Sequence, residues 1–597
     1  MKKKLFSAIA LLTCFTSVFS MAACNLGGTG NGGNGGTSDS GNGGNGGTIT
    51  VDPLTAAELG EGFNETYLPD KASIKQYSGK IDIALDFEGT VSGWDALAAE
   101  YERLQGGGVD VNVIKTYSGS TYTGKLNNEL NNAQTDWDIV EGNLGYGSTR
   151  KRCVDMYPSV SSYNPYCGPQ TMWSTVLQSA AYKTKEADNS GESYIMNSEI
   201  MQTCWFVNDT ALADAAALGY KNAMGKASYP VTWEDLISLC DYMKQAGYTN
   251  PLGITLCDAS IESLQFTWLL RVYGDYYYRQ FYEYIMAGEV GTAWTDYSPD
   301  ATVLEASPTY GVQWAKLLNM MLDKDCEFGK GYVGMTSEVY LDFVGNLAKM
   351  KGYLMKDASS TEFTALRDEF ETQSDGKSSP QIVLDYQGFG INYGKSDKIE
   401  LGYFDYPQMM AGNYTKGEFE GEPIVDNENT ITRDIGGNGG FLSVINHTDK
   451  MQNDLNKDFM KFVLSPYGQT IYYKGLAAAG EVPKGLSSVK NELVVIPNEW
   501  KAFFEESNET LVFNGDVDAN PFLSWGVRYV NGYTETQKII RENWRNLLLT
   551  GLAADQVLSP AGFAGRWETA VVADSAELIA FNGWPNEFWK DPSYVLG

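Results

Sequence analysis

The chain has 597 residues, with 44 lysines and arginines against 75 aspartates and glutamates, which gives a formal net charge of −31 at pH 7. Such an acidic balance without a basic patch argues against nucleic acid and against anionic sugars as partners. The one histidine, His447, excludes metal sites built on several histidines and argues against a histidine-based catalytic triad. We therefore expect no catalytic residue, no metal and no cofactor.

The first residues are typical of a lipoprotein signal. Three lysines, residues 2–4, precede a short apolar stretch, residues 5–19, and the sequence MAAC follows. Small residues before a cleavage point indicate a secretory signal peptide, here residues 1–23, and the cysteine after them suits lipid attachment at Cys24. The alternative is an ordinary signal peptide with an incidental cysteine.

A glycine-rich segment follows this cysteine. Between residues 25 and 50, 12 of the 26 residues are glycine, and most of the others are Asn, Ser or Thr. Such a segment cannot form a core and behaves as a flexible coil with a span of about 25–30 Å. No other stretch is long and apolar enough to cross a bilayer. We expect residues 24–70 to tether a globular part to the outer face of the cell membrane, in a Gram-positive organism.

From residue 80 onward the pattern becomes α/β. Residues 80–89 alternate as a strand, residues 92–108 have a helical pattern that ends in glycines, and residues 109–117 alternate as a second strand. A second helix over 121–134 and a third strand over 136–143 complete the series. Strands that alternate with helices predict a parallel, doubly wound sheet.

Polar and aromatic residues follow each of these strands. In an open parallel sheet, ligands bind beyond the carboxyl ends of the strands, so these residues should gather at one edge. Carboxylates and amides bind sugar hydroxyls, and aromatic rings stack on sugar faces, although each residue alone also suits a structural role. The candidates are Asp86, Phe87 and Glu88 after the first strand, Tyr117 after the second, and Glu141, Asn143 and Tyr146 after the third.

Cysteines outside the signal and the lipidation site are even in number, which suggests disulfides in an extracellular protein. Cys153 and Cys167 bracket a loop rich in proline and tyrosine, so they are the first disulfide that we expect; Cys240 and Cys257 come next. Buried free thiols are the alternative. The full set is Cys153, Cys167, Cys204, Cys240, Cys257 and Cys326.

Several stretches carry a family resemblance in their order along the chain. They are the run over 80–143, then MNSEIMQTCWFVND, VTWEDL, EVYLDFVGNLAKM and GGNGGFLSVINHTDK. In VTWEDL, Thr232 is a helix N-cap and Asp235 completes a capping box. The set resembles family 1 extracellular solute-binding proteins, the maltose-binding-like receptors of sugar importers. This resemblance covers most of residues 80–490.

The resemblance implies a two-lobe α/β fold of the periplasmic-binding-protein type. Crossover strands join the lobes, a hinge lies in these strands, and the ligand is held in a cleft between the lobes, where closure excludes water. Lobe 1 would comprise residues 78–200 and 395–465. Lobe 2 would comprise residues 201–394 and 466–597.

The second lobe and the crossovers add candidate ligand contacts. Core packing is the alternative for the aromatic residues among them. A helix that should turn at Gly274 carries three consecutive tyrosines, of which we expect at least one to be exposed. The GGNGG stretch allows backbone to approach a ligand closely. The added candidates are Trp205, Trp268, Asp275, Tyr276, Tyr277, Asn438 and Trp525.

We therefore expect a lipid-anchored, extracellular and monomeric receptor that binds a neutral carbohydrate, an oligosaccharide, and delivers it to an ABC importer permease without acting as an enzyme. Two alternatives stay open. One is a lipid-anchored glycoside hydrolase or lyase, with Glu88 and Glu141 as paired carboxylates. The other is a surface lipoprotein that captures glycans without a transporter.

Overall fold

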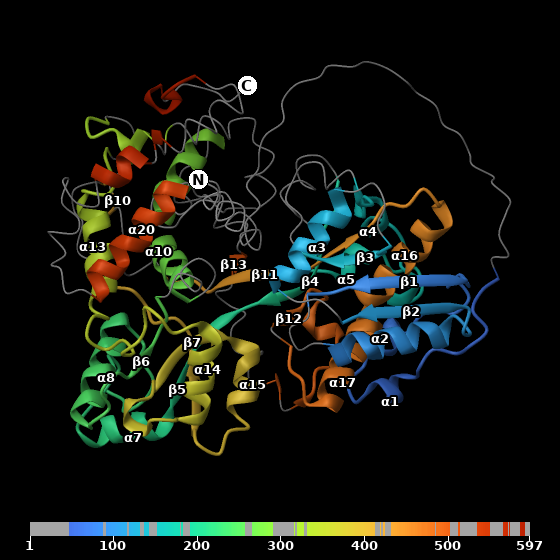
Figure 1. Ribbon diagram of the computed structural model, residues 1–597, viewed down its shortest axis with the longest axis horizontal. Coiled ribbons are helices and arrows are strands. Elements are labelled where there is room, and N and C mark those ends of the chain that lie inside the picture. Colours follow the sequence, from blue (N-terminus) through green and yellow to red (C-terminus); the bar gives the residue numbers. More distant parts are fainter. Residues whose placement is uncertain are drawn as a thin grey trace, which may run out of the picture. The chain divides into compact units, whose positions relative to one another are not determined.

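The computed structural model divides the chain into two compact units, drawn in Figure 1. Unit 1 comprises Met1–Ile200 and Asn438–Ala502, and unit 2 comprises Met201–Gly437 and Phe503–Gly597. The structure describes residues 47–86, 91–115, 119–131, 136–142, 152–178, 181–182, 192–256, 265–290, 316, 319–326, 331–411, 418–419, 422–423, 431–483, 485–498, 500–501, 512–513, 534–549, 565–570, 572–573 and 585–591.

This division differs from the predicted lobe boundaries at two places. Residues 395–437 fall in unit 2, because strand β8 (Leu401–Phe404) pairs with strand β5 (Thr203–Asn208) of that unit. Residues 466–502 fall in unit 1, because helix α17 (Pro466–Ala479) packs on helix α2 (Val91–Leu104). Both assignments depend on contacts between segments far apart in the sequence. The predicted α/β class is confirmed in each unit, and the predicted ligand cleft stays a prediction.

Unit 1 is built around a sheet with the strand order β12-β4-β11-β3-β1-β2. β1 pairs in parallel with β2 on one side and with β3 on the other, whereas β11 runs antiparallel to β3. The parallel pairing predicted for the first three strands is therefore confirmed, whereas the sheet as a whole is mixed, since β12 also runs antiparallel to β4. The strands are β1 (Gly79–Ala84), β2 (Val109–Ile114), β3 (Ile139–Glu141), β4 (Met196–Met201), β11 (Ile435–Val444) and β12 (Leu486–Ser487).

Helices α2 and α17 of unit 1 pack closely because glycines lie between them. A Cβ atom on Gly475 would lie 2.6 Å from the Cβ of Ala96, and one on Gly93 would lie 2.4 Å from the ring of Tyr472. Among the described residues, unit 1 contains helices α1 (Ala56–Leu59), α2 (Val91–Leu104), α3 (Gly119–Asn131), α4 (Tyr157–Val160), α5 (Trp173–Val176), α16 (Lys450–Val463) and α17 (Pro466–Ala479), with 3-10 turns η1 (Glu65–Tyr67), η3 (Pro165–Cys167) and η8 (Asn491–Leu493).

Residues 47–78, which we call the strap, are ordered on unit 1. The Leu54 backbone N–H donates to the Tyr467 hydroxyl at 2.9 Å, and the Asp70 N–H donates to the Pro165 carbonyl at 2.8 Å. Apolar side chains such as Leu59 are fully buried. Ordered structure thus begins well before residue 70, where the prediction ended the tether, because this segment has apolar residues to bury.

Unit 2 contains a four-stranded sheet with the order β6-β7-β5-β8. β5 pairs antiparallel with β7 and with β8, and β6 pairs in parallel with β7. A short antiparallel pair, β9 with β10, lies apart from it, and β13 pairs in parallel with residues 435–436 of β11. The strands are β5 (Thr203–Asn208), β6 (Leu252–Gly253), β7 (Ile382–Tyr386), β8 (Leu401–Phe404), β9 (Glu418–Phe419), β10 (Glu422–Pro423) and β13 (Val512–Phe513).

The capping box predicted for VTWEDL is confirmed at the start of α8. The Thr232 hydroxyl accepts from the Asp235 N–H at 3.2 Å, and the Asp235 carboxylate accepts from the Thr232 N–H at 2.9 Å. The described part of unit 2 contains α7 (Asp209–Ala217), α8 (Trp233–Gln245), α10 (Gln265–Val290), α13 (Glu338–Ala348), α14 (Phe363–Thr372), α15 (Gly390–Tyr393) and α20 (Thr534–Leu548), with 3-10 turns η6 (Gly376–Ser378), η7 (Gln387–Phe389) and η10 (Phe588–Lys590).

No helix within the described ranges combines the length and the apolar character that crossing a bilayer requires. This finding covers only those ranges. The predicted lipidation site, Cys24, lies outside the described residues, as does the predicted signal peptide.

The disulfide predicted between Cys153 and Cys167 is wrong, since Cys167 is a buried free thiol. Cys153 pairs its backbone with Ile445 beside β11, and its side chain packs in a cluster with Tyr122. Cys167 instead lies in η3, which packs on α17. The segment between the two cysteines therefore connects two different parts of unit 1. Cys257, in the second expected pair, lies outside the described residues.

We expect the thiols of Cys167, Cys204 and Cys240 to resist modification in the native protein. Burial raises the pKa of each thiol, which removes the reactive thiolate. Treatment with iodoacetamide should therefore label them only after denaturation, without any reductant. Mass spectrometry of the digested protein measures this. A peptide pair joined through any of these residues would contradict the prediction.

Candidate functional site

The carboxyl edge of the unit 1 sheet brings Asp86 and Glu141 together. The Asp86 backbone N–H donates to Glu141 Oε2 at 3.1 Å, across the ends of β1 and β3. Both side chains are half-buried. The parallel pairing of the two strands causes this meeting, because it sets their carboxyl ends side by side. The edge thus brings together two acidic residues that are only half-buried.

Tyr122 of α3 contacts the backbone at the ends of β1 and β3. Its hydroxyl lies 2.8 Å from the carbonyl oxygen of Ala84 and 2.5 Å from that of Glu141, and it accepts from the Glu141 N–H at 3.1 Å. Burial, with Glu141 as a second cause, raises the pKa of Tyr122, so the hydroxyl stays protonated. Its ring stacks on Trp137 with 5.9 Å between centroids. Tyr122 therefore positions the ends of both strands.

Five further residues predicted for this edge lie outside the described residues. They are Phe87, Glu88, Tyr117, Asn143 and Tyr146. The same holds for Trp525. Asn438 lies in β11, but its side chain is outside what the structure describes. Their roles as ligand contacts stay predictions.

The predicted residues of unit 2 that the structure describes are all buried. Exposed fractions are 0% for Trp205, Tyr276 and Tyr277, 2% for Asp275 and 8% for Trp268. The expectation that one of the three consecutive tyrosines is exposed is wrong, since Tyr278 is only 2% exposed. α10 continues through Gly274 instead of turning there, and the side chains described between Gln265 and Phe281 are all buried. Burial favours structural roles for this set.

Two of these residues show how such roles arise. The Trp205 ring stacks on Phe404 of the neighbouring strand, with 6.3 Å between ring centroids. Asp275 forms an ion pair with Arg433, at 2.6 Å, and another with Arg279, at 3.2 Å. A buried carboxylate that already faces two guanidinium groups is not available to a sugar.

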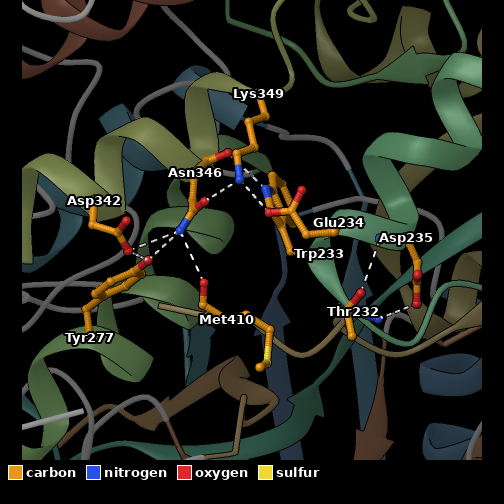
Figure 2. Close-up of polar contacts among 9 residues, drawn as sticks. All are labelled: Thr232, Trp233, Glu234, Asp235, Tyr277, Asp342, Asn346, Lys349 and Met410. Atoms are coloured by element: carbon orange, nitrogen blue, oxygen red, sulfur yellow. Dashed lines mark hydrogen bonds and ion pairs between the residues drawn. The ribbon is translucent and has the colours of Figure 1, made fainter. Parts of the chain in front are cut away.

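A polar network that the sequence did not indicate is centred on Asn346 of α13. Figure 2 shows its side chain donating to the Tyr277 hydroxyl at 2.7 Å and to Asp342 Oδ2 at 3.2 Å, and accepting from Lys349 at 2.7 Å. Its carbonyl accepts from Trp233 Nε1 at 2.8 Å. The network joins α8, α10 and α13, and its contacts identify it as structural.

The carboxyl end of β7 offers a second candidate surface. Tyr386 is half-buried there, and its ring lies edge-on to Trp268 with 4.7 Å between centroids. Phe389, also half-buried, is covered on one face by the guanidinium of Arg367 at 3.4 Å. Between them, Gln387 has a buried Oε1 with no hydrogen-bond partner. Aromatic edges beside an amide acceptor are chemistry that suits a sugar.

This second surface was not among the residues predicted from the sequence. Its signal was present in LDYQGFG, where an apolar strand ends in tyrosine, glutamine and phenylalanine. Only the parallel pairing of β7 with β6 identifies that end as a carboxyl edge. Within the described ranges, no group of three or more His, Cys, Asp or Glu residues could hold a metal ion.

Comparisons with known proteins give a likeness in solved structures alone. No family model matches the chain, and no curated protein matches it. A family 1 extracellular solute-binding protein from Bifidobacterium longum subsp. infantis has 14% identity and a TM-score of 0.48, covering 84% of this chain and 99% of that chain. The GacH receptor of Streptomyces glaucescens, solved with acarbose, has 12% identity and a TM-score of 0.48, covering 85% and 100%.

A third similar structure is BlMnBP1, a binding protein of an ABC transporter from Bifidobacterium animalis subsp. lactis in complex with mannobiose. It has 12% identity and a TM-score of 0.44, and the match covers 83% of this chain and 95% of that chain.

Proposed function

We propose that the protein is an extracellular receptor that binds a neutral carbohydrate, an oligosaccharide, and delivers it to the permease of an ABC importer. It is monomeric, does not act as an enzyme and is held at the membrane through a lipid on Cys24. The motif order from residue 80 to residue 490 supports this proposal, as does the acidic charge, which disfavours anionic sugars.

The observation that carries the proposal is the meeting of Asp86 and Glu141 at the carboxyl edge of the unit 1 sheet. The Asp86 N–H donates to one oxygen of the Glu141 carboxylate, at 3.1 Å, and fixes its position. A fixed and half-buried carboxylate can accept hydrogen bonds from vicinal sugar hydroxyls with little loss of side-chain entropy. Tyr122 holds the backbone beneath it, so the acceptor is prearranged.

The carboxyl end of β7, in unit 2, is a second candidate contact surface considered by itself. Tyr386 and Phe389 are half-buried there, and the buried Oε1 of Gln387 has no hydrogen-bond partner. Aromatic rings gain from contact with the apolar face of a pyranose, whereas amides read its hydroxyls. We propose that these residues of unit 2 contact the same class of ligand.

The first test is a thermal-shift screen of residues 25–597, which keeps the strap intact, against neutral oligosaccharides. A ligand at 100 times its Kd should add about 2.7 kcal/mol to the free energy of unfolding. Chromatography of the glycan afterwards checks that it is unchanged. Cleavage of the glycan would instead move the protein to the hydrolase alternative, and no shift with any glycan would contradict the proposal.

Replacing Glu141 by glutamine should weaken the binding of the glycan found in that screen by roughly 10- to 150-fold. This range corresponds to the loss of a hydrogen bond to a charged acceptor, about 1.5–3 kcal/mol. Glutamine keeps an oxygen for the Asp86 N–H, so the fold should be preserved. Isothermal titration calorimetry measures the change. Glu61→Gln, on the exposed strap, is the matched control and should leave the affinity unchanged.

An unchanged affinity in Glu141→Gln would show that this edge does not contact the ligand. Tyr386→Ala, tested in the same way, then separates the two candidate surfaces. Loss of binding in Tyr386→Ala alone would place the ligand at β7.

A further inference from the structure

Residues 431–434 of unit 2 form a segment that leads directly into β11, the strand within which the chain passes to unit 1. We call residues 431–434 the docked segment. The Thr432 N–H donates to Gln408 Oε1 at 2.8 Å, and the Thr432 hydroxyl accepts from the Met409 N–H at 2.9 Å. The Ile431 carbonyl accepts from Arg279 of α10 at 3.0 Å. Hydrogen bonds to two elements of unit 2 thus hold the segment in place.

An ion pair adds to these contacts. Arg433 donates through Nε and Nη2 to the two carboxylate oxygens of Asp275, at 2.9 and 2.6 Å. Burial alone would raise the pKa of Asp275, but Arg433 and Arg279 outweigh it and hold this pKa below its usual range. Asp275 is therefore charged, and the guanidinium of Arg433 is directed at it rather than at the next residue of the segment.

That next residue, Asp434, is also buried, but its pKa is shifted by this burial and by a carboxyl group rather than by arginines. Only 5% of it is exposed, and its carboxyl receives a hydrogen bond from the Tyr406 backbone N–H. The neighbouring carboxyl of Asp405 lies close enough to repel a negative charge on it. Burial, and then Asp405, raise the pKa of Asp434 to about 8. The carboxyl is thus mostly neutral at pH 7.

The ionisable groups around Asp434 come from three elements. Asp405 and Tyr406 follow β8, Cys204 lies on β5, and Tyr273 lies on α10. The two tyrosines and the cysteine are neutral, because burial raises their pKa values well above the usual range. A charge on Asp434 would therefore sit beside neutral groups and the repelling carboxyl of Asp405, whereas the positive charge of Arg271, also on α10, acts on Tyr406.

We propose that Asp434 makes the attachment of the docked segment to unit 2 dependent on pH: the segment is held while the carboxyl carries its proton, and it opens together with release of that proton. In the open state the carboxylate reaches water and its repulsion by Asp405 is relieved. Opening would start at Asp434 and extend into Ile435, the first residue of β11. This inference does not depend on the ligand.

The direction of the pH effect follows from proton linkage. The pKa of Asp434 is about 8 in the closed state and near 3.8 when the carboxyl is in water. The neutral form therefore stabilises the closed state fully below pH 4, and this contribution is lost as the pH rises towards 8. The opening equilibrium should increase up to tenfold per pH unit between about pH 5 and 8, and it should level off above that.

Hydrogen–deuterium exchange of residues 25–597 without ligand tests this proposal. After correction for intrinsic exchange rates, protection of peptides covering 431–444 and 401–411 should fall up to tenfold per pH unit between pH 5 and 8. In Asp434→Asn, which keeps an acceptor for the Tyr406 N–H but cannot ionise, protection should be independent of pH. In Asp405→Asn, the loss of protection should level off at a lower pH. Removing the repulsion between Asp405 and Asp434 lowers the pKa of Asp434 in the closed state.

The matched control is Asp397→Asn, at a side chain that is 88% exposed, and it should behave as the unmodified protein. Peptides covering β5 serve as the internal reference. Equal pH dependence in Asp434→Asn and in the unmodified protein would overturn the proposal. So would a loss of protection as large in β5 as in residues 431–444, since this would report unfolding of the whole unit.

Discussion

Replacing Asp275 by asparagine should destabilise unit 2 by roughly 3–5 kcal/mol, the usual cost of removing one partner from a buried ion pair. Two guanidinium groups, Arg433 at 2.6 Å and Arg279 at 3.2 Å, would then lose the carboxylate that neutralises them. Asp275 is 2% exposed, so water cannot replace it. Urea denaturation at pH 7, followed by tryptophan fluorescence, measures the change in the free energy of unfolding.

Two further variants make this result specific. Glu234→Gln removes one partner of the exposed ion pair with Lys349 and should cost no more than about 1 kcal/mol. Combining Asp275→Leu with Arg433→Met should recover part of the lost stability, because only the charge of Arg279 then stays uncompensated. A loss below 1 kcal/mol in Asp275→Asn would contradict the assignment of this buried cluster.

The pH dependence of the same variant offers an independent check. The pKa of Asp275 lies below its usual range in the folded protein, so its stabilising contribution is present at neutral pH and is lost as the pH falls through this lowered pKa. The difference between the unmodified protein and Asp275→Asn should therefore shrink in strong acid.

Trp233→Ala should destabilise unit 2 by roughly 3–5 kcal/mol, the range for truncating a fully buried aromatic side chain. Trp233 is 0% exposed and its ring lies edge-on to Tyr273, with 4.9 Å between centroids. Its Nε1 also donates to the Asn346 carbonyl, as Figure 2 shows. The variant would leave a cavity and an unsatisfied carbonyl. Thermal and urea denaturation measure the loss.

Trp233→Phe separates these two contributions. Phenylalanine fills most of the space but cannot donate, so the loss should be about 1–3 kcal/mol, the cost of an unsatisfied buried acceptor plus a smaller cavity. Val231→Ala, at a 37% exposed position two residues away, should stay within about 0.5 kcal/mol. If Trp233→Ala were as mild as Val231→Ala, the packing described for α8 would be wrong.

Local patterns were sufficient to predict the first strands of unit 1 and the start of one helix in unit 2. Alternation over residues 80–89 and 109–117 placed β1 and β2, and the Thr232–Asp235 capping box placed the start of α8. These features depend on neighbours within a few positions, which a sequence displays directly. The lobe boundaries depend instead on pairing of β8 with β5 and on packing of α17 on α2, which it does not display.

In the candidate site, too, some residues could be predicted from the sequence and others could not. Asp86 and Glu141 follow strands that pair in parallel, so topology alone brought them together. The prediction for α10 failed because Gly274 and a run of tyrosines were interpreted as a turn with an exposed ring. A helix whose residues are buried around Gly274 hides such side chains equally well, and single-sequence periodicity cannot distinguish the two cases. The contacts of Asn346 likewise join three helices and have no local signal.

The strap has a mechanical consequence. Tension on the chain before residue 47 would be borne first by its antiparallel contacts, the Ile49 N–H with the Ile74 carbonyl at 3.1 Å and the Gln76 N–H with the Gly47 carbonyl at 2.8 Å. Further along the strap, Arg103 of α2 donates to the Asp52 carbonyl at 3.0 Å, and the Leu54 N–H donates to the Tyr467 hydroxyl of α17 at 2.9 Å. Pulling would thus release these single hydrogen bonds in chain order, starting at Gly47, so the strap would detach from unit 1 step by step rather than all at once.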